Sequence, residues 1–377
     1  MKELIPGEWW GIESIIVGNN FELPGLRKLK TIATFIYLFS FLLCFQIGVR
    51  GQQKENSEAY ISVGLLVDEN NETEASIAVQ NAIQLINEKG GVKGEKLNLI
   101  TRSVEGTWGA GSSKIVELVF EEKVIAIIGS LDARNTHLAE QVIAKTQVPF
   151  LSAWASDSSL TNAYVSWFFS IVPNDEQQAQ ILLNETCINK NLKELMVVFD
   201  GSYDSDQAYK SLLEKAEQFP ELEIHPLRFQ AQEDASKVVA EMRKNRADGL
   251  IFLGRELPLK TIQELMISAK INIPVFGNVA AHGSKDILDN KDFIMPFTNS
   301  WINGNKALCE ELYFRTKEKK CNIIRALAFD AVMTLKSALE ISKGDQNELK
   351  AGLGQVNYQG ITGPIEFDSL GRIKTSE

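Results

Sequence analysis

The chain has 377 residues, which is long enough for two domains with separate hydrophobic cores. Hydrophobic residues make up 44% of the chain and charged residues 23%, and the formal net charge is −10. There is no dense stripe of Lys and Arg, so nucleic acid is excluded as an expected partner. The composition is that of an ordinary globular protein without low-complexity tracts.

An apolar run near the N-terminus predicts export. Residues 32–49 are almost wholly apolar, Arg27, Lys28 and Lys30 precede them, and Gly51 follows as a small residue. This pattern is typical of a secretory signal cleaved after Gly51, so that residues 1–51 are a signal peptide with an upstream extension. The alternative is an uncleaved anchor, because about 18 apolar residues approach the length that spans a bilayer. In both cases the rest of the chain is expected in the periplasm or facing outside the cytoplasm.

Three cysteines follow Gly51, and an exported compartment permits disulfides. Cys309 and Cys321 could pair and leave Cys187 free, or all three could be buried thiols. The cysteines form no metal-binding motif, so we expect neither a metal nor a cofactor. The scattered histidines, which we expect on the surface or in loops, are His137, His225 and His282.

Short apolar runs and amphipathic stretches alternate in the first half of the chain. Apolar runs rich in β-branched residues predict buried parallel strands at residues 60–67, 96–101, 124–129 and 148–151. Helices are expected at 75–89, from a cap at Ser112 or Ser113 to 122, and around Leu138, Val142 and Ile143. Residues 164–172 are expected to cross to a second unit.

The same rhythm recurs in the second half. A helix is expected after Pro173-Asn174-Asp175, because Pro and acidic residues favour the first turn. Further strands are expected at 195–199, 222–229, 249–253, 273–276 and 293–298, and further helices at 207–219, 235–245, 259–269, 305–320 and 323–342. A hairpin-like segment is expected at 360–368. This repeated alternation predicts an α/β fold with two similar lobes, each a doubly wound parallel sheet.

Two loops are candidates for a ligand site. Residues 130–135 and 152–159 are rich in Ser, Asn and Asp, and each follows a predicted strand. Ligands of open α/β sheets bind outside the carboxyl ends of the strands. Both loops also lead into helices, whose free N–H groups hold anions. The sequence therefore predicts a small-molecule site here.

Several motifs carry a resemblance to a known family. They are INEKGGVKGEKLNLI (86–100), VIAIIGS (124–130), VPFLSAWASDSSLT (148–161), FFSIVPNDEQQAQ (168–180) and ITGPIEFDSLGR (361–372). In their order and spacing, the chain resembles the type I periplasmic binding proteins, in the branch of leucine/isoleucine/valine-binding proteins that serve ABC importers. The resemblance covers about residues 60–372. It implies two Rossmann-like lobes joined by a three-segment hinge, with 52–172 and 299–360 in lobe 1 and 173–298 and 361–377 in lobe 2.

The resemblance also implies ligand contacts, residue by residue. In the family, the loop that follows the strand matching 148–151 holds an amino acid through a backbone group and a hydroxyl. These are here Ala155 and Ser156. Tyr203 stands where the family often has a tyrosine that covers the ligand. The loop from Ser130 departs from the family's serines, and Asp204-Ser205-Asp206 replaces its Gly-x-Gly. These departures leave a hydrophobic amino-acid specificity open.

In the family, an acidic residue of the second lobe often binds the ligand amine. The matching position, Asn278, is not acidic, so Asp132 and Glu256 are the candidates. Trp108 and Trp154 fall in expected cleft loops, where an indole could stack on a ligand or simply pack its loop. Arg134 and Arg255 could pair with a ligand carboxylate, or be solvated arginines. The complete set of candidate ligand-binding residues is Trp108, Ser130, Asp132, Arg134, Trp154, Ala155, Ser156, Tyr203, Arg255, Glu256 and Asn278.

The expected function is that of an exported, monomeric solute-binding protein of an ABC-type importer. It would bind an amino acid or amide-like small molecule in the interlobe cleft by hinge closure and then dock on a membrane permease. The alternative is a ligand-sensing ectodomain of the same fold. An enzyme is not expected: Asp132, Asp157 and Glu256 could supply carboxylates, but no G-x-G-x-x-G, P-loop, G-x-S-x-G or metal signature is present.

Overall fold

The computed structural model describes residues 60–67, 74–104, 110–130, 132–230, 235–255, 257–282 and 323–375. Several expectations lie outside these ranges. They concern the signal segment 1–51, the candidates Trp108 and Glu256, the pair Cys309 and Cys321, the expected strand at 293–298 and the expected helix at 305–320.

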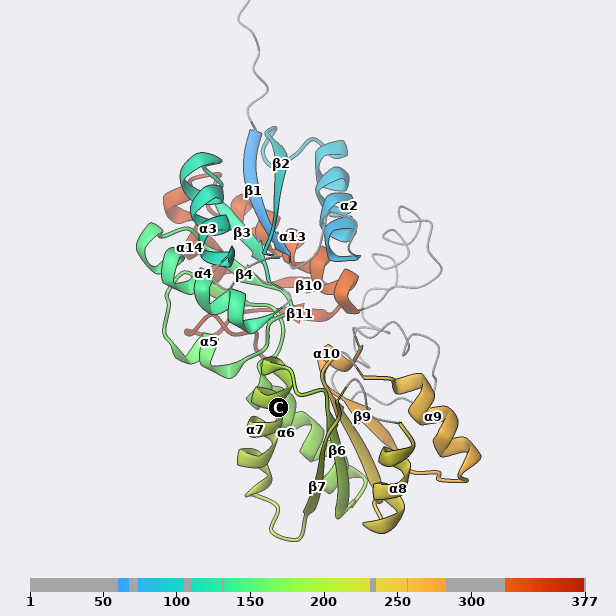
Figure 1. Cartoon of the computed structure of the whole chain (residues 1–377). Helices are drawn as coiled ribbons and strands as arrows, with labels where there is room; N and C mark the ends of the chain where they lie inside the picture. The colour runs from blue at the N-terminus through green and yellow to red at the C-terminus, as the bar shows by residue number, and fades with distance from the viewer. Residues whose placement is uncertain are drawn as a thin grey trace, which may run out of the picture. The chain divides into compact units, whose positions relative to one another are not determined.

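The first sheet has five parallel strands in the order β2-β1-β3-β4-β5 (Figure 1). Their bounds are β1 Tyr60–Val67, β2 Lys96–Ser103, β3 Ala126–Gly129, β4 Phe150–Ser152 and β5 Phe168–Ser170. The parallel pairing confirms the expected doubly wound architecture. The expected crossing segment, 164–172, contains the fifth strand, because Phe168 and Phe169 are buried on opposite faces of the sheet and pair with β4.

Helices cover both faces of this sheet. They are α2 Glu74–Glu88, α3 Ala110–Val116 with the π-helical turn η1 Glu117–Glu121, α4 Ala133–Thr146 and α5 Ser158–Asn162. Strand β1 shows why: Val63 and Leu65 enter the core beneath α2, whereas Leu66 enters the core beneath α3 and α4. The expected cap at Ser112 or Ser113 is wrong, because both serines lie inside α3.

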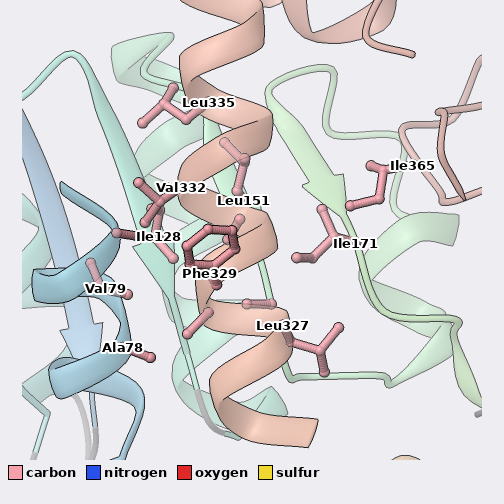
Figure 2. Packing of buried hydrophobic residues seen from close by; sticks show 14 of the residues in the cluster. Ala78, Val79, Ile128, Leu151, Ile171, Leu327, Phe329, Val332, Leu335 and Ile365 are labelled. Atoms are coloured by element: carbon pink, nitrogen blue, oxygen red, sulfur yellow. The ribbon is translucent and has the colours of Figure 1, made fainter. Parts of the chain in front are cut away.

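The C-terminal part of the chain packs on the first sheet. It comprises α13 Ile323–Ile341, the 3-10 turn η3 Gln346–Glu348, α14 Leu349–Gly354, β10 Tyr358–Gly360 and β11 Gly363–Ile365, with β10 and β11 antiparallel. Figure 2 shows Phe329 of α13 among Val79 of α2 and Ile128 and Leu151 of the sheet.

The segment after β10 belongs to the same core. Ile365, Phe367 and Ile373 are buried in the cluster that contains α13 and the first sheet, and Ser170 of β5 bridges to Arg372. The expected division placed residues 361–377 in the second lobe. Their apolar side chains instead pack with the first sheet, because β11 forms a hairpin with β10 directly after α14.

The second sheet is parallel with the order β7-β6-β8-β9. Its strands are β6 Glu194–Phe199, β7 Glu223–Arg228, β8 Gly249–Leu253 and β9 Val275–Gly277. Its helices are α6 Asp175–Leu183 with the π-helical turn η2 Asn184–Asn189, α7 Tyr203–Ala216, α8 Ser236–Lys244, α9 Leu259–Ser268 and α10 Val279–His282. Along β6, Met196 and Val198 pack with α8 and α9, whereas Leu195 and Val197 pack with α6 and α7.

The helix caps explain two boundaries. Helix α6 begins after Asn174 with a capping box, in which Asn174 and Gln177 exchange side chain to backbone hydrogen bonds. Helix α7 begins at Tyr203, four residues earlier than expected, because the Ser202 side chain accepts a hydrogen bond from the Ser205 N–H. Tyr203 and Asp204 therefore lie in a first helical turn and not in a loop.

Two further findings concern the N-terminal and cysteine expectations. Within the part of the chain that the structure describes, no helix combines the length and apolarity needed to cross a membrane. Cys187 is a half-buried free thiol, and burial raises its pKa.

Candidate ligand-binding site

Two strands of the first sheet end side by side at the loops that the sequence singles out. Gly129 of β3 is in register with Ser152 of β4, so the loops that follow start next to each other. Ser130 and Ser152 are fully buried, and the Ser152 hydroxyl donates to the Ala155 carbonyl at 3.1 Å. The two loops thus converge at one edge of the sheet, as expected.

Asp132 caps helix α4. Its carboxylate accepts a hydrogen bond from the Asn135 N–H at 2.8 Å and another from the Asn135 side-chain amide at 2.8 Å. The Ser130 hydroxyl lies 3.5 Å from Asp132 Oδ2, the oxygen that also accepts from the Asn135 side-chain amide. A carboxylate of the chain therefore already occupies the N-terminus of α4, the place where an external anion was expected.

Asp157 is the centre of a polar cluster at the start of α5. It accepts hydrogen bonds from the Ser159 N–H at 2.9 Å and from the Tyr203 hydroxyl at 3.0 Å, and its Oδ2 lies 3.1 Å from His137 Nε2. Burial alone would raise the pKa of Asp157, but the hydrogen bonds from His137, Ser159 and Tyr203 outweigh it and lower the pKa to about 2. Asp157 is therefore ionised at neutral pH.

His137 carries the positive charge of this cluster. Its Nδ1 lies 3.1 Å from Glu140 Oε2, while its Nε2 faces Asp157. The hydrogen bonds to Asp157 and Glu140 raise the pKa of His137 to about 9 against the opposing effect of burial. Glu140 is almost fully buried, and this burial raises its pKa. His137 is thus an imidazolium held between two carboxyl groups, not a surface or loop histidine as expected.

Helix α7 of the second sheet reaches this cluster through its first turn. Tyr203 donates to Asp157, and the Arg134 guanidinium lies 5.1 Å from the centroid of the Tyr203 ring, a cation–π geometry. Asp204 accepts a hydrogen bond from the Ala133 N–H at 3.0 Å. Burial raises the pKa of Asp204 to about 6, although the hydrogen bond from Ala133 opposes this shift. Side chains of α7 therefore contact the N-termini of α4 and α5.

Ser156 is tied to the start of α6. Its hydroxyl donates to Asp175 Oδ1 at 2.7 Å, and its carbonyl accepts from the Asp175 N–H at 2.7 Å. Asp175 is buried, which raises the pKa of its carboxyl well above the ordinary value, and its Oδ2 has no hydrogen-bond partner among the described residues. The hydroxyl expected to donate to a ligand therefore donates within the chain, and its lone pairs remain available to a ligand donor.

The candidates of the second sheet follow the carboxyl ends of their strands. Asp200, after β6, accepts a hydrogen bond from the Arg255 N–H, after β8, at 2.8 Å. Asn278, after β9, is buried and accepts from the Gly254 N–H at 3.3 Å and the Ala281 N–H at 3.0 Å. The Asn278 side chain thereby connects the β8 and β9 loops.

Two candidates of the β4 loop lie in the core. Trp154 is buried in the cluster of α13, and its indole N–H donates to the Ile324 carbonyl at 3.1 Å. Ala155 is buried in the core beneath α4. The Trp154 ring therefore packs its loop against α13, which is the second of the two roles that its sequence position left open.

The sequence-predicted residues Ser130, Asp132, Arg134 and Tyr203 are thus brought close to one cluster. The principal members of that cluster, His137, Glu140 and Asp157, were not among the candidate ligand-binding residues. His137 and Glu140 carry a local signal, since residues three apart on a helix lie on the same face. Asp157 carries the signal of a helix cap before Ser158-Ser159. The participation of Asp175 and Asp204 has no local signal.

Comparison with known proteins places this geometry in a family. Residues 63–373 match the model of the family described as periplasmic binding protein. Among solved structures, the chain is similar to the branched-chain amino acid transporter substrate binding protein LivJ of Streptococcus pneumoniae in complex with isoleucine, with a TM-score of 0.70 and 20% identity over 83% of this chain and 93% of that one.

Two further structures have the same fold. The leucine binding protein LivK of Thermotoga maritima has a TM-score of 0.67 and 16% identity, over 82% of this chain and 92% of that one. A solute binding protein of an ABC transporter from R. palustris in complex with benzoate has a TM-score of 0.65 and 14% identity, over 83% and 90%. Because the family match spans most of the chain, this protein belongs to the periplasmic binding protein family.

Proposed function

We propose that the protein is an extracytoplasmic solute-binding protein of an ABC-type importer, and that its solute is an amino acid or an amide-like small molecule. The observation that carries the proposal is the polar cluster around Asp157, where the N-termini of α4, α5 and α7 meet. Family membership and the similarity to proteins that hold isoleucine or benzoate support it.

The charges of this cluster favour a zwitterionic solute. Asp132 and Asp157 place carboxylates at two helix starts. Because His137 is already paired with Asp157, an ammonium or amide N–H group of the solute fits beside Asp132. Arg134 and Arg255 offer guanidinium groups that can pair with a carboxylate. Such a solute would be held by residues following both sheets, and its binding would favour closure of the lobes.

The partner and the fate of the solute follow from this role. A solute captured between two lobes can be handed to a membrane permease that recognises the closed form. The protein binds the solute without converting it and works as a monomer. The same fold would also suit a ligand sensor. The partner is therefore identified separately, by purifying the protein from the membrane fraction and testing whether a permease is bound to it.

Thermal unfolding of the purified protein tests the proposal. The panel contains free amino acids, short amides, polyamines and small carboxylates. A solute at a hundredfold excess over its Kd stabilises the native state by about 2.7 kcal/mol, which raises Tm clearly. Ser156→Ala and Arg134→Ala should weaken this shift, whereas Ser268→Ala, whose hydroxyl donates only to the Glu264 carbonyl of its own helix, should leave it unchanged.

Several outcomes would contradict the proposal. The solute assignment is wrong if no compound of the panel raises the Tm of well-folded protein. Equal shifts in wild type and in Arg134→Ala and Ser156→Ala would place binding elsewhere. Chemical conversion of a bound compound would show an enzyme instead.

A further inference from the structure

Three potential metal ligands lie together at the amino end of the second sheet. In the parallel register of β6 and β7, Glu194 is opposite Glu223 and Met196 is opposite His225. Alternate residues of a strand face the same side, so Glu223 and His225 share one face of β7. The same face of β7 carries Leu227, which is buried in one core with Met196. Glu194, two residues before Met196, lies on this face as well.

The distances suit a small cation. One carboxylate oxygen of each glutamate and one ring nitrogen of His225 all lie within 4.8 Å of one another, and His225 Nε2 is 2.7 Å from Glu194 Oε2. A tetrahedral zinc ion with bonds of about 2.0–2.1 Å separates its ligands by roughly 3.3 Å. The strand register already places the three residues next to one another. Rotation of their side chains can therefore bring the ligand atoms from within 4.8 Å to this spacing. All three side chains are at least partly accessible to solvent.

The charge balance of the cluster also favours a cation. Two carboxylates directly opposite each other on neighbouring strands repel. His225 can compensate at most one of them, through its contact with Glu194. Glu223 has no ion pair with any described residue, and the nearby Lys193 is paired with Glu221 at 2.5 Å. A divalent ion would neutralise both carboxylates.

We propose that Glu194, Glu223 and His225 form a binding site for a divalent transition-metal ion, with Zn²⁺ as the best fit. Imidazole and carboxylate are ligands that zinc accepts, and three protein ligands leave a fourth position for water or an external group. Because β7 is the edge strand of the sheet, the ion would tie this strand to β6. The site is separate from the solute site, which follows the carboxyl ends of the strands.

Zinc titration of metal-free protein tests this proposal. The free thiols are first blocked with iodoacetamide, and binding of Zn²⁺ is followed by calorimetry, with Tm as a second readout and Mg²⁺ as the comparison ion. We expect uptake of one Zn²⁺ and a rise in Tm. His225→Asn and Glu223→Gln each remove one ligand and should weaken binding by more than the roughly 10- to 100-fold that loss of an outer-shell partner costs.

The control is chosen from the competing cluster. His137→Asn removes the histidine between Glu140 and Asp157 and should keep the wild-type zinc affinity. The proposal is overturned if the wild type binds no Zn²⁺ at millimolar concentration, or if only His137→Asn loses it. If His225→Asn fails to fold, Glu223→Gln decides, because the Glu223 side chain is exposed.

Discussion

Replacing His137 by Asn should remove a pH-dependent part of the protein's stability. His137 lies between Asp157 and Glu140, and their hydrogen bonds raise its pKa from 6.5 to about 9. A histidine with a raised pKa in the folded state contributes stability that is fully present below pH 6.5 and is lost as the pH rises through 9. Asp157, whose pKa is about 2, stays ionised throughout this range.

The size of the effect follows from the shift. A difference between 6.5 and about 9 corresponds to roughly 3.4 kcal/mol at 1.36 kcal/mol for each pKa unit. The His137 side chain is 31% exposed, so solvent screens part of this interaction. We therefore expect about 1–2 kcal/mol of stability in the wild type that His137→Asn lacks at pH 6, and almost none of this difference at pH 9.5.

Urea unfolding at a series of pH values between 6 and 9.5 measures this difference. Subtracting the free energy of unfolding of His137→Asn from that of the wild type at each pH cancels the titration of groups that do not interact with His137. The difference should shrink across the window from pH 6.5 to 9. A difference that stays constant over this range would refute the assignment of an imidazolium shared by the two carboxyl groups.

Three further substitutions test the core and the cluster. Phe329→Ala removes a fully buried ring of α13 and should lower the free energy of unfolding by about 3–5 kcal/mol, so a loss below about 1 kcal/mol in urea unfolding would contradict its place in the core. Asp330→Ala leaves the Ile361 and Thr362 N–H groups without their acceptor and should cost about 3 kcal/mol by the same measurement, whereas Asp330→Asn, which keeps an acceptor, should cost less. Tyr203→Phe removes the hydrogen bond to Asp157 and should raise the Kd of the solute that the panel identifies about tenfold in calorimetric titration, and an unchanged Kd would exclude Tyr203 from the site.

The fold was largely predictable because its signals are local. The run YISVGLLV ends in five residues that are all buried, as expected for a central parallel strand, and β1 has the predicted bounds, Tyr60–Val67. Strand β5 was missed because Phe168–Ser170 lies inside a longer, largely apolar run at 165–172, which does not show where a strand begins or ends. Its identity depends on pairing with β4, which is a property of the folded sheet.

The first turn of α7 contains one feature that the sequence could predict and one that it could not. Ser202 followed by Asp204 and Asp206 is a helix-start pattern, so the first turn at Tyr203 could have been predicted. The contact of Asp204 with the Ala133 N–H joins helices α7 and α4, which follow strands of two different sheets. No local pattern predicts such a contact, because it depends on how the two halves of the chain pack.

The site differs from its expectation in one physical respect. From the sequence, ligand anions were expected at the helix N-termini that follow the strands, because free N–H groups attract negative charge. In the structure, Asp132 caps α4 and Asp157 caps α5. An external carboxylate would have to displace these side chains or approach them against charge repulsion. The carboxylate of a solute is therefore expected on the guanidinium groups, and its ammonium or amide group beside Asp132.

Removing the negative charge of this cap, by replacing Asp132 with Asn, should weaken the binding of cationic and zwitterionic solutes more than that of simple carboxylates. Equal losses for all solute classes would show that Asp132 only caps its helix.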